Sequence, residues 1–459
     1  MALRRLLSCL LALSLLGAAS PSLAEWPVPA ALRAAVDGLE ASQRAFVESG
    51  APLLLLPEAQ LRHELATRDA AGAAAFVASL MALADEMRYD ASRDMGAIPL
   101  NLTTKEFNWG RVPTPRALRK GDREAGPFSV HRYLFPESGI PTFAGAPVAI
   151  DPEDLVAGSV DVAIIGVPSD MSSGRRGAAQ APHMMRAVNT IAVPDSQALI
   201  DPTQVLTIVD YGSFYVDQMS VERSVDHVTA MVAETAATGA VPMLVGGDTS
   251  VLYPGVKGVA EARGAGSFGL LHFSAHPDAD RHAVHSVSDE QALFLLLDEG
   301  IVRGSDTIQV GLRGPAVNAD TLGWLREQQV RYHTMAEIRH RGFPRVLDRV
   351  LSEVYAGPER FFVSIDVSVI EPAEMVSAGR VASDGLRVQQ AARAIRQVCA
   401  TKEIVGFELT DLSPMLDYSR LSVVNANTLL NACLVGMAVR TAGLKPDYVH
   451  PYALDHGQR

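Results

Sequence analysis

Three side chains that could bind a divalent metal follow two apolar runs of the sequence. His276 and Asp278 come shortly after the run 268–273, and Asp366 ends the run 361–366. Imidazole nitrogens and carboxylate oxygens are ligands that divalent cations use in proteins. If both runs are parallel strands of one sheet, their carboxyl ends meet at the same edge. The sequence therefore predicts a metal site at that edge.

Each of these motifs also has a purely structural interpretation. The tetrapeptide 275–278, Ala-His-Pro-Asp, commonly forms a capped turn, and an aspartate at a strand end often caps the next helix. Asp248, after the apolar run Val241–Val245, is a further acidic residue expected at the same edge. The prediction depends on convergence of these side chains and not on any one motif.

Apolar runs and helical stretches alternate from about residue 155, which predicts one large α/β domain with a mainly parallel, eight-stranded sheet. The expected strands are Val160–Val167, Val205–Asp210, Val241–Val245, Phe268–Phe273, Thr307–Val310, Val330–His333, Phe361–Asp366 and Ile404–Thr410. Helical stretches between them include Val221–Thr238, Asp289–Glu299, Ala319–Gln328, Val388–Ala400 and Arg420–Ala442.

The N-terminal part of the chain differs from the rest. Residues 1–24 combine a basic start, an apolar run and a small-x-small end, which is typical of a signal peptide. We therefore expect an exported protein, periplasmic or secreted. Residues 25–135 form a helical extension and polar arm, with helices expected at 30–48, 57–67 and 70–87, and residues 136–459 form the α/β domain. The extension is interpreted as a packed appendage or as a subunit contact.

Composition excludes two classes of partner. The 459 residues are 48% hydrophobic and 20% charged, with a mean hydropathy of +0.13, as in soluble globular proteins. Lys plus Arg is 40 and Asp plus Glu is 52, and the net charge of −12 includes no basic block. We therefore expect no nucleic-acid partner, and no membrane association once the signal peptide is removed.

The cysteines carry little functional information. Of the three, Cys9 lies in the signal peptide, and Cys399 and Cys433 lie in predicted helices. An exported protein could form a disulfide, but the sequence does not place the two residues within bonding distance. Two buried thiols are the slightly favoured interpretation.

Several ordered motifs resemble one enzyme family. They are Gly139–Phe143, Val162–Pro168 with Arg175–Ala178 and Pro182, Gly311–Gly314, Gly406–Pro414 and the helix at Asn425–Leu430. Together with the strand-end motifs they resemble the ureohydrolases, the family of arginases, agmatinases and related guanidine hydrolases. The resemblance covers Gly139 to about Arg440. It implies a single three-layer, arginase-like domain, a pair of manganese ions held by two histidines and four aspartates, and hydrolysis of a guanidino group.

The chain departs from the family pattern at the metal site. By the resemblance, small hydroxyl residues replace one histidine and three acidic residues: Thr249, Ser274, Ser368 and Ser213. His276, Asp278 and Asp366 are retained. One hypothesis is that the site stays polar and suits a hydrogen-bonded ligand; the other is that the hydroxyls only satisfy local backbone groups.

Charge then limits the metal content. Asp278 and Asp366 supply two negative charges, against four positive charges on two divalent ions, so dinuclear manganese is not expected. One divalent ion, Mn, Ni or Zn, on these carboxylates and His276 would be balanced and could still acidify water. The resemblance assigns His276 and Asp278 to different ions, so weak occupancy or none is also open.

Three further residues are candidates for catalysis. His282 and His285 lie where the family loop carries a proton-shuttling histidine, and they could relay a proton, bind a relocated metal or belong to a solvated loop. Asp411 stands where the family uses a glutamate to orient the substrate guanidinium. The segment Met375–Gly379 replaces the family's Pro-Gly-Thr-Gly turn at the substrate mouth, so substrate preference is not carried over.

Three functions follow from the resemblance. The first is amidinohydrolase activity on a guanidino or amidino compound, with urea release and a reduced or altered metal site. The second is an inactive homologue that binds a small ligand or serves as a regulatory or structural subunit. The third is a single-metal hydrolase of another C–N bond. By resemblance we expect a trimer or hexamer, formed with itself or with an active paralogue.

Overall fold

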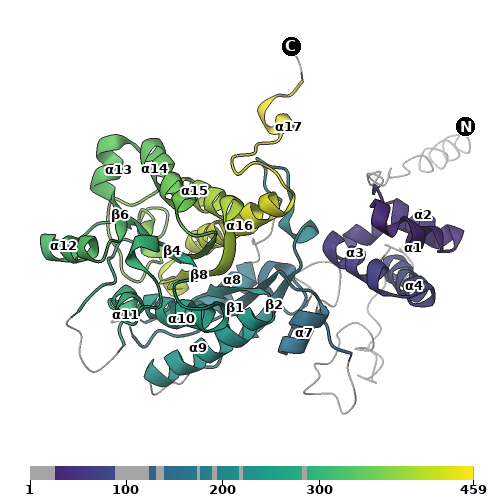
Figure 1. Cartoon of the computed structure of the whole chain (residues 1–459), viewed down its shortest axis with the longest axis horizontal. Helices are drawn as coiled ribbons and strands as arrows, with labels where there is room; N and C mark the ends of the chain where they lie inside the picture. The colour runs from purple at the N-terminus through teal and green to yellow at the C-terminus, as the bar shows by residue number, and fades with distance from the viewer. Residues whose placement is uncertain are drawn as a thin grey trace, which may run out of the picture. The chain divides into compact units, whose positions relative to one another are not determined.

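The computed structural model describes residues 26–87, 124–130, 139–172, 176–188, 194–216, 221–281 and 287–457. The chain divides into two compact units, Met1–Gly96 and Ala97–Arg459, and each is described by itself (Figure 1). The predicted signal peptide and two catalytic candidates, His282 and His285, lie outside the described residues.

The N-terminal unit is helical, with a small core of its own. Its elements are η1 Ala30–Leu32, α1 Arg33–Asp37, α2 Ala41–Glu48, η2 Ala51–Leu54, α3 Glu58–Thr67 and α4 Ala70–Met87. Val47, Leu61 and Val77 are fully buried in it. The single helix expected at 30–48 is wrong, because the chain breaks at Gly38 and restarts after Glu40, which forms a capping box with α2.

The larger unit contains the predicted sheet. Its strands are β1 Val162–Gly166, β2 Ile208–Ser213, β3 Val241–Val245, β4 Gly269–Phe273, β5 Thr307–Leu312, β6 Arg331–Thr334, β7 Arg360–Asp366 and β8 Glu403–Thr410. All seven strand pairings are parallel, in the order β2-β1-β3-β8-β7-β4-β5-β6. Strands β1 and β4 are buried throughout, as expected when helices cover both faces of a parallel sheet.

Helices cover both faces, which confirms the three-layer α/β fold (Figure 1). One face packs on α8, α14, α15 and α16, and the other packs on α9, α10, α11 and α12. The helices are α7 Pro152–Ala157, α8 Ala181–Val188, α9 Val221–Ala237, α10 Leu252–Arg263, α11 Ala292–Asp298, α12 Ala319–Glu327, α13 Met335–Arg341, α14 Phe343–Ala356, α15 Val388–Thr401, α16 Leu421–Thr441 and α17 Pro451–Leu454. Short 3-10 turns complete the unit at η5 Phe143–Gly145, η6 Ala178–Gln180, η7 Pro202–Gln204, η8 Thr249–Val251, η9 Gly304–Asp306, η10 Val367–Val369 and η11 Pro414–Leu416.

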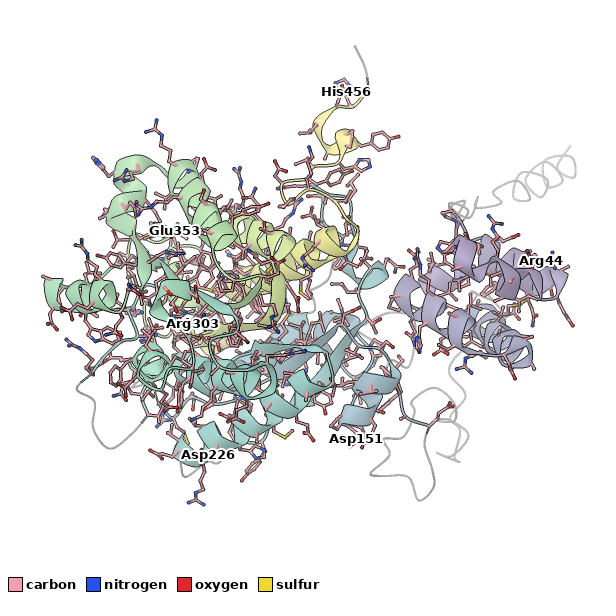
Figure 2. The ribbon with its side chains drawn as sticks, in the orientation of Figure 1. Arg44, Asp151, Asp226, Arg303, Glu353 and His456 are labelled. Carbon is pink, nitrogen blue, oxygen red and sulfur yellow. A yellow bond between two sulfur atoms is a disulfide. The ribbon has the colours of Figure 1, made fainter. Side chains whose placement is uncertain are left out.

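Side chains follow the same layering. Polar side chains such as Asp226 on α9 and His456 near the C-terminus lie at the outer margin of the unit (Figure 2). Helix α10 was not among the expected stretches, and its Pro254, Gly255 and Gly258 lower helix propensity. It forms because it packs closely on α9: a Cβ at Gly258 would lie 2.6 Å from Val232.

A disulfide joins the two helices that pack together on one face of the sheet. Cys399 of α15 and Cys433 of α16 are bonded, with their Cα atoms 5.3 Å apart. The expectation of two free thiols is therefore wrong, because close packing of α15 on α16 brings residues 34 positions apart within bonding distance.

Helix α16 is, among the described residues, the one helix with the length and hydropathy to cross a membrane. However, 78% of its most apolar window is buried inside the protein. Burial in the core accounts for its composition.

A guanidinium-centred site at the carboxyl ends of the strands

Four neighbouring strands bring the predicted site residues to one edge of the sheet. In the order β3-β8-β7-β4, their carboxyl ends lead to Thr249, Asp411, Asp366 and Asp278 respectively. We call the following group the strand-end site: Thr249, Ser274, His276, Asp278, Asp366, Ser368, Arg380 and Asp411. The convergence inferred from the sequence is therefore present, with one member, Arg380, that sequence reasoning missed.

The Arg380 guanidinium lies between the retained aspartates. Its Nη1 donates to Asp278 Oδ1 at 2.9 Å, and its Nη2 donates to Asp366 Oδ2 at 2.8 Å. The same Nη2 lies 2.8 Å from Thr249 Oγ1, and Nε lies 3.4 Å from Asp289 Oδ2. The two aspartate side chains are fully buried, and Arg380 is 11% exposed. A delocalised guanidinium thus supplies the positive charge at this edge of the sheet.

Local backbone geometry directs Arg380 into the site. The Arg380 amide donates to Asp411 Oδ2 at 2.8 Å, and the Gly379 amide donates to the Asp411 carbonyl at 2.9 Å. A Cβ at position 379 would lie 2.3 Å from Asp411 Oδ1, so this approach requires glycine. Asp411 therefore acts here as an anchor for the segment that carries Arg380.

The other side of the same segment is held by Arg313, from the motif after β5. Its guanidinium donates to the carbonyl oxygens of Ser383 at 2.9 Å, Ala382 at 2.8 Å and Ser368 at 2.6 Å. Buried carbonyls that accept from a charged donor form strong hydrogen bonds. Arg313 and Asp411 thus fix the segment from both ends, with Arg380 between them.

The hydroxyl residues hydrogen-bond to the charged groups of the site. Ser274 Oγ lies 3.2 Å from Asp278 Oδ2 and 3.1 Å from Asp366 Oδ2, and Thr249 Oγ1 lies 3.1 Å from Asp366 Oδ2. Ser368 Oγ lies 3.3 Å from Nδ1 of His276. Backbone amides are also satisfied, since His276 N donates to Ser274 Oγ and Ala275 N to Ser368 Oγ. The hydroxyls therefore bind backbone amides, as one hypothesis holds, and also the charged side chains of the site; a role in binding a ligand stays a prediction.

Ser213 is not part of this group. It ends β2, and its hydroxyl accepts a hydrogen bond from Arg186 at 3.1 Å. Asp248 also has a structural role, because its carboxylate caps η8 by accepting from the Ser250 amide and hydroxyl.

Electrostatics separates the acids of the site into two kinds. Burial opposes ionisation of Asp278, but Arg380 and His272 outweigh it and lower the pKa of Asp278 to about 2. Burial and the negative charge of Asp366 raise the pKa of Asp411 well above its usual range, although Arg380 opposes this. Asp278 is thus ionised at neutral pH, whereas burial beside Asp366 favours the neutral form of Asp411.

The pKa values of Arg380 and His276 are shifted as well. Burial opposes the charge on Arg380, and Asp278 and Asp366 outweigh it, so the pKa of Arg380 is raised. Burial and then the Arg380 charge lower the pKa of His276. The His276 imidazole is therefore neutral at pH 7 and leaves Arg380 as the positive charge that faces both aspartates.

A line of buried polar groups continues from Asp278 into the core. His272 Nε2 lies 2.9 Å from Asp278 Oδ2, and its Nδ1 lies 2.8 Å from Ser364 Oγ. Ser364 in turn donates to Glu408 Oε1 at 2.6 Å. Burial raises the pKa of Glu408 to about 8, because, unlike Asp278, it has no arginine beside it.

The predicted metal ligands are close together but do not fit a metal in this arrangement. Within the described ranges, no three His, Cys, Asp or Glu side chains are arranged to hold an ion. The Arg380 guanidinium already uses oxygens of Asp278 and Asp366, and His276 Nδ1 is 4.0 Å from Asp366 Oδ2. A divalent ion there would also face the Arg380 charge at close range, which is unfavourable in a buried site.

One feature of the sequence points to Arg380 as a site residue. The segment between β7 and α15 departs from the family turn at 375–379, and an arginine follows directly. Two buried aspartates need a positive partner, and Arg380 provides it.

Comparison with known proteins identifies the relatives of the larger unit. The model of the Arginase family matches residues 160–436. A mitochondrial guanidino acid hydrolase from Homo sapiens is 28% identical over 64% of this chain and 81% of its own. A guanidinopropionase from Pseudomonas aeruginosa is 27% identical over 66% of this chain and 94% of its own.

Solved structures share the same fold. A hypothetical agmatinase from Burkholderia thailandensis matches with a TM-score of 0.60 and 22% identity, over 70% of this chain and 99% of its own. Proclavaminate amidinohydrolase from Streptomyces clavuligerus matches with a TM-score of 0.59 and 23% identity, over 66% of this chain and 98% of its own. A formiminoglutamase from Trypanosoma cruzi, whose structure was determined with Mn²⁺, matches with a TM-score of 0.56 and 21% identity, over 61% of this chain and 95% of its own.

Proposed function

Since the chain belongs to the arginase family, we propose that it is a non-hydrolytic member in which the Arg380 guanidinium replaces the metal pair. The observation that carries the proposal is the pair of hydrogen bonds from Arg380 to Asp278 and Asp366. The protein then serves as a ligand-binding or regulatory subunit. In the described structure its strand-end site is stabilised internally.

The hydrogen bonds inside the site support this proposal. A manganese pair in the family acidifies the attacking water and needs several anionic ligands. Here one guanidinium hydrogen-bonds to both retained aspartates and offsets one of their two negative charges, and the hydroxyls of Thr249 and Ser274 complete their hydrogen bonds. Both carboxylates thus have hydrogen-bond partners without an ion.

The alternative is an amidinohydrolase that acts on a guanidino or amidino compound with one divalent ion, Mn, Ni or Zn. It is favoured by the relatives named above, whose names include guanidino acid hydrolase and guanidinopropionase. In that case His276, Asp278 and Asp366 would hold the ion, which would activate water, and Arg380 would have to leave the site. His282 or His285 would relay a proton, and Asp411 would bind the substrate cation.

One experiment separates these functions. Mature protein is prepared with excess Mn, Ni and Zn, its metal content is measured, and urea release is assayed over a panel of guanidino compounds. We expect less than about 0.1 metal per chain and no urea above background, because Arg380 blocks the ligands. Stoichiometric metal with chelator-sensitive urea release would establish the hydrolase and overturn the proposal; stoichiometric metal without urea release would point to another C–N bond.

Arg380→Ala provides the matched control. Removing the guanidinium restores free carboxylates at Asp278 and Asp366, so metal binding by this variant should rise above that of the wild type. If neither protein binds metal, the remaining ligand set is too small, and the non-hydrolytic assignment stands. If both bind equally, Arg380 does not exclude the ion and the proposal is wrong.

We also propose that the protein is exported, with residues 1–24 as its signal peptide. The Cys399–Cys433 disulfide supports this, because such bonds persist in oxidising compartments. Mass spectrometry of the mature N-terminus should identify Glu25 as the first residue, and a retained Met1 would contradict the proposal.

Assembly is a further part of the proposal. From the family resemblance we propose a trimer or hexamer, formed with itself or with an active paralogue. Sedimentation velocity of the mature protein, with and without such a paralogue, tests it, and a monomer under all conditions would contradict it.

A further inference from the structure

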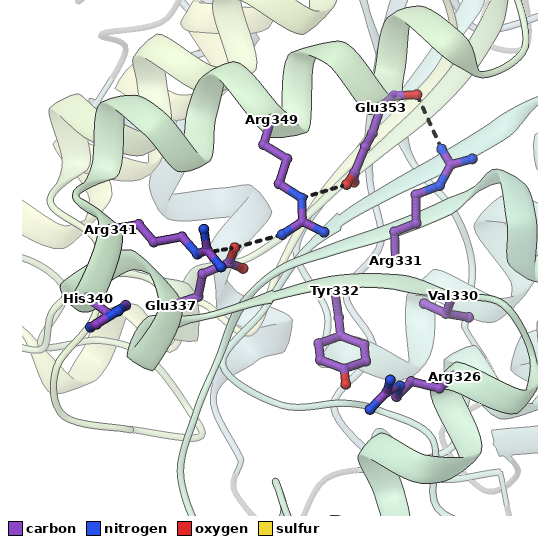
Figure 3. Close-up of a pocket in the computed structure, with 9 residues that line it drawn as sticks. All are labelled: Arg326, Val330, Arg331, Tyr332, Glu337, His340, Arg341, Arg349 and Glu353. Atoms are coloured by element: carbon purple, nitrogen blue, oxygen red, sulfur yellow. Dashed lines mark hydrogen bonds and ion pairs between the residues drawn. The ribbon is translucent and has the colours of Figure 1, made fainter.

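A second group of charged side chains lies along β6, the outermost strand of the sheet. Helices α12, α13 and α14 flank a pocket of about 560 Å³ there. We call it the edge pocket; Figure 3 shows its lining, which is Arg326, Val330, Arg331, Tyr332, Glu337, His340, Arg341, Arg349 and Glu353. None of these residues belongs to the strand-end site.

The two carboxylates of the edge pocket are already paired. His333, which is 1% exposed, lies beneath them with Nδ1 3.0 Å from Glu337 Oε2 and Nε2 3.0 Å from Glu353 Oε2. Arg349 bridges the same two groups, at 2.9 Å to Glu337 Oε1 and 3.2 Å to Glu353 Oε1 (Figure 3). These contacts engage both oxygens of each carboxylate.

Positive charge therefore remains in excess. The lining has four arginines against two glutamates, a difference of two charges before His340 is counted. The Arg326 side chain has no hydrogen bond or ion pair with any residue in the described part of the chain, while the Arg331 side chain donates to the Glu353 carbonyl at 3.3 Å. Arg341 lies 3.4 Å from Glu337 Oε1, a contact too long for a strong hydrogen bond.

This local excess contrasts with the whole chain, whose net charge is −12. A concave surface of one sign concentrates its field and attracts small ions of the other sign. Arginine forks match the oxygens of a phosphate group in pairs. The volume is in the range of small-ligand pockets, and Tyr332 also lines the pocket and offers a ring against which a flat group could pack (Figure 3).

We propose that the edge pocket binds a small phosphate-bearing ligand, either inorganic phosphate or a phosphate monoester. Arg326 and Arg341 contact its oxygens, and the His333–Glu337–Glu353–Arg349 network holds the lining in place. The proposal is independent of the function assigned to the strand-end site, since the two share no residue.

The test uses isothermal titration calorimetry of the whole mature protein with inorganic phosphate, AMP and succinate. We expect saturable binding of phosphate, of AMP or of both. AMP binding more tightly would indicate a monoester, whereas equal affinities would indicate free phosphate. Succinate should bind at least about tenfold more weakly, because each of its carboxylates has one negative charge and two oxygens, whereas a phosphate monoester has up to two charges and three acceptor oxygens at one centre.

Single substitutions test whether the ligand binds in the edge pocket. Arg326→Gln and Arg341→Gln should each weaken it about tenfold, the expected loss of one charge-assisted hydrogen bond. Arg345→Gln is the matched control, since Arg345 is an exposed arginine on α14 that does not line the pocket, and it should change affinity less than about twofold.

Four outcomes would overturn the proposal. They are no saturable heat up to about 10 mM phosphate or AMP, succinate binding as tightly as phosphate, equal weakening by all three variants, and subunit dissociation in Arg326→Gln. The last would assign the edge pocket to a contact between copies.

Discussion

The strand-end site and the edge pocket are two charged regions of one sheet, built in opposite ways. In the first, buried aspartates surround one arginine, and nearly every polar group is satisfied from within the chain. In the second, arginines surround two glutamates that already have partners. We infer from the comparison that a ligand is to be expected where charged donors, such as the Arg326 side chain, have no acceptor in the described part of the chain.

The two regions also differ in how much their charged groups should contribute to stability, because one is buried and the other is exposed. Asp278 and Asp366 are fully buried, so they depend on Arg380, because an unpaired buried charge is costly. Arg326 is exposed, and water can solvate it when no ligand is bound. The same residue type should thus be essential for folding in one place and dispensable in the other.

The largest expected effect is at Arg380. Arg380→Ala leaves two buried carboxylates without a partner and should lower the free energy of unfolding by about 3–5 kcal/mol, measured by urea denaturation at pH 7. The triple variant Arg380→Met with Asp278→Asn and Asp366→Asn removes all three charges and should recover most of that loss. A loss below about 1 kcal/mol for Arg380→Ala would show that the ion pairs contribute little.

The disulfide gives a reference that involves neither charged region. Replacing Cys399 and Cys433 by alanine should lower the unfolding free energy by about 2–4 kcal/mol. Unlike Arg380→Ala, this variant should leave metal binding unchanged. If it also changes metal binding, general destabilisation, and not the loss of the guanidinium, accounts for the behaviour of Arg380→Ala.

Glu408 is a buried acid with no arginine beside it, and its effect on stability should depend on pH. Its pKa is raised from 4.5 to about 8, so the stability associated with its neutral form is fully present below about pH 4.5 and is lost as the pH rises through 8. Glu408→Gln stays neutral and should gain stability relative to the wild type between pH 5 and pH 9, by an amount on the order of 1–3 kcal/mol. Urea denaturation of both proteins at pH 5 and at pH 9 measures this gain. The same difference in unfolding free energy between variant and wild type at both pH values would contradict the prediction.

The smallest effect is expected at Arg326. Arg326→Gln should change the unfolding free energy by less than about 0.5 kcal/mol, as most surface substitutions do. The contrast with Arg380→Ala in the same denaturation assay tests the comparison directly. A loss similar to that of Arg380→Ala would mean that the edge pocket is also held together by its own charges.

Much of the fold could be predicted from the sequence, because it depends on local patterns. All eight strands lie within a few residues of their predicted ranges, since fully buried parallel strands appear as continuous apolar runs. His276, Asp278 and Asp366 could be placed together for the same reason: each follows or ends such a run. The break after Gly38 could have been found from the Gly38–Leu39–Glu40 sequence, which has a helix stop followed by a cap.

What the sequence alone determined is therefore the sheet and the residue types at its carboxyl edge, with Asp278 and Asp366 among them. Tertiary structure decided which group partners these two buried carboxylates, because the direction of Arg380 depends on contacts with Asp411 and Gly379 and on Arg313 behind its segment. It also decided that Cys399 meets Cys433. Such contacts join residues far apart in the chain, and their geometry is fixed only when the layers pack.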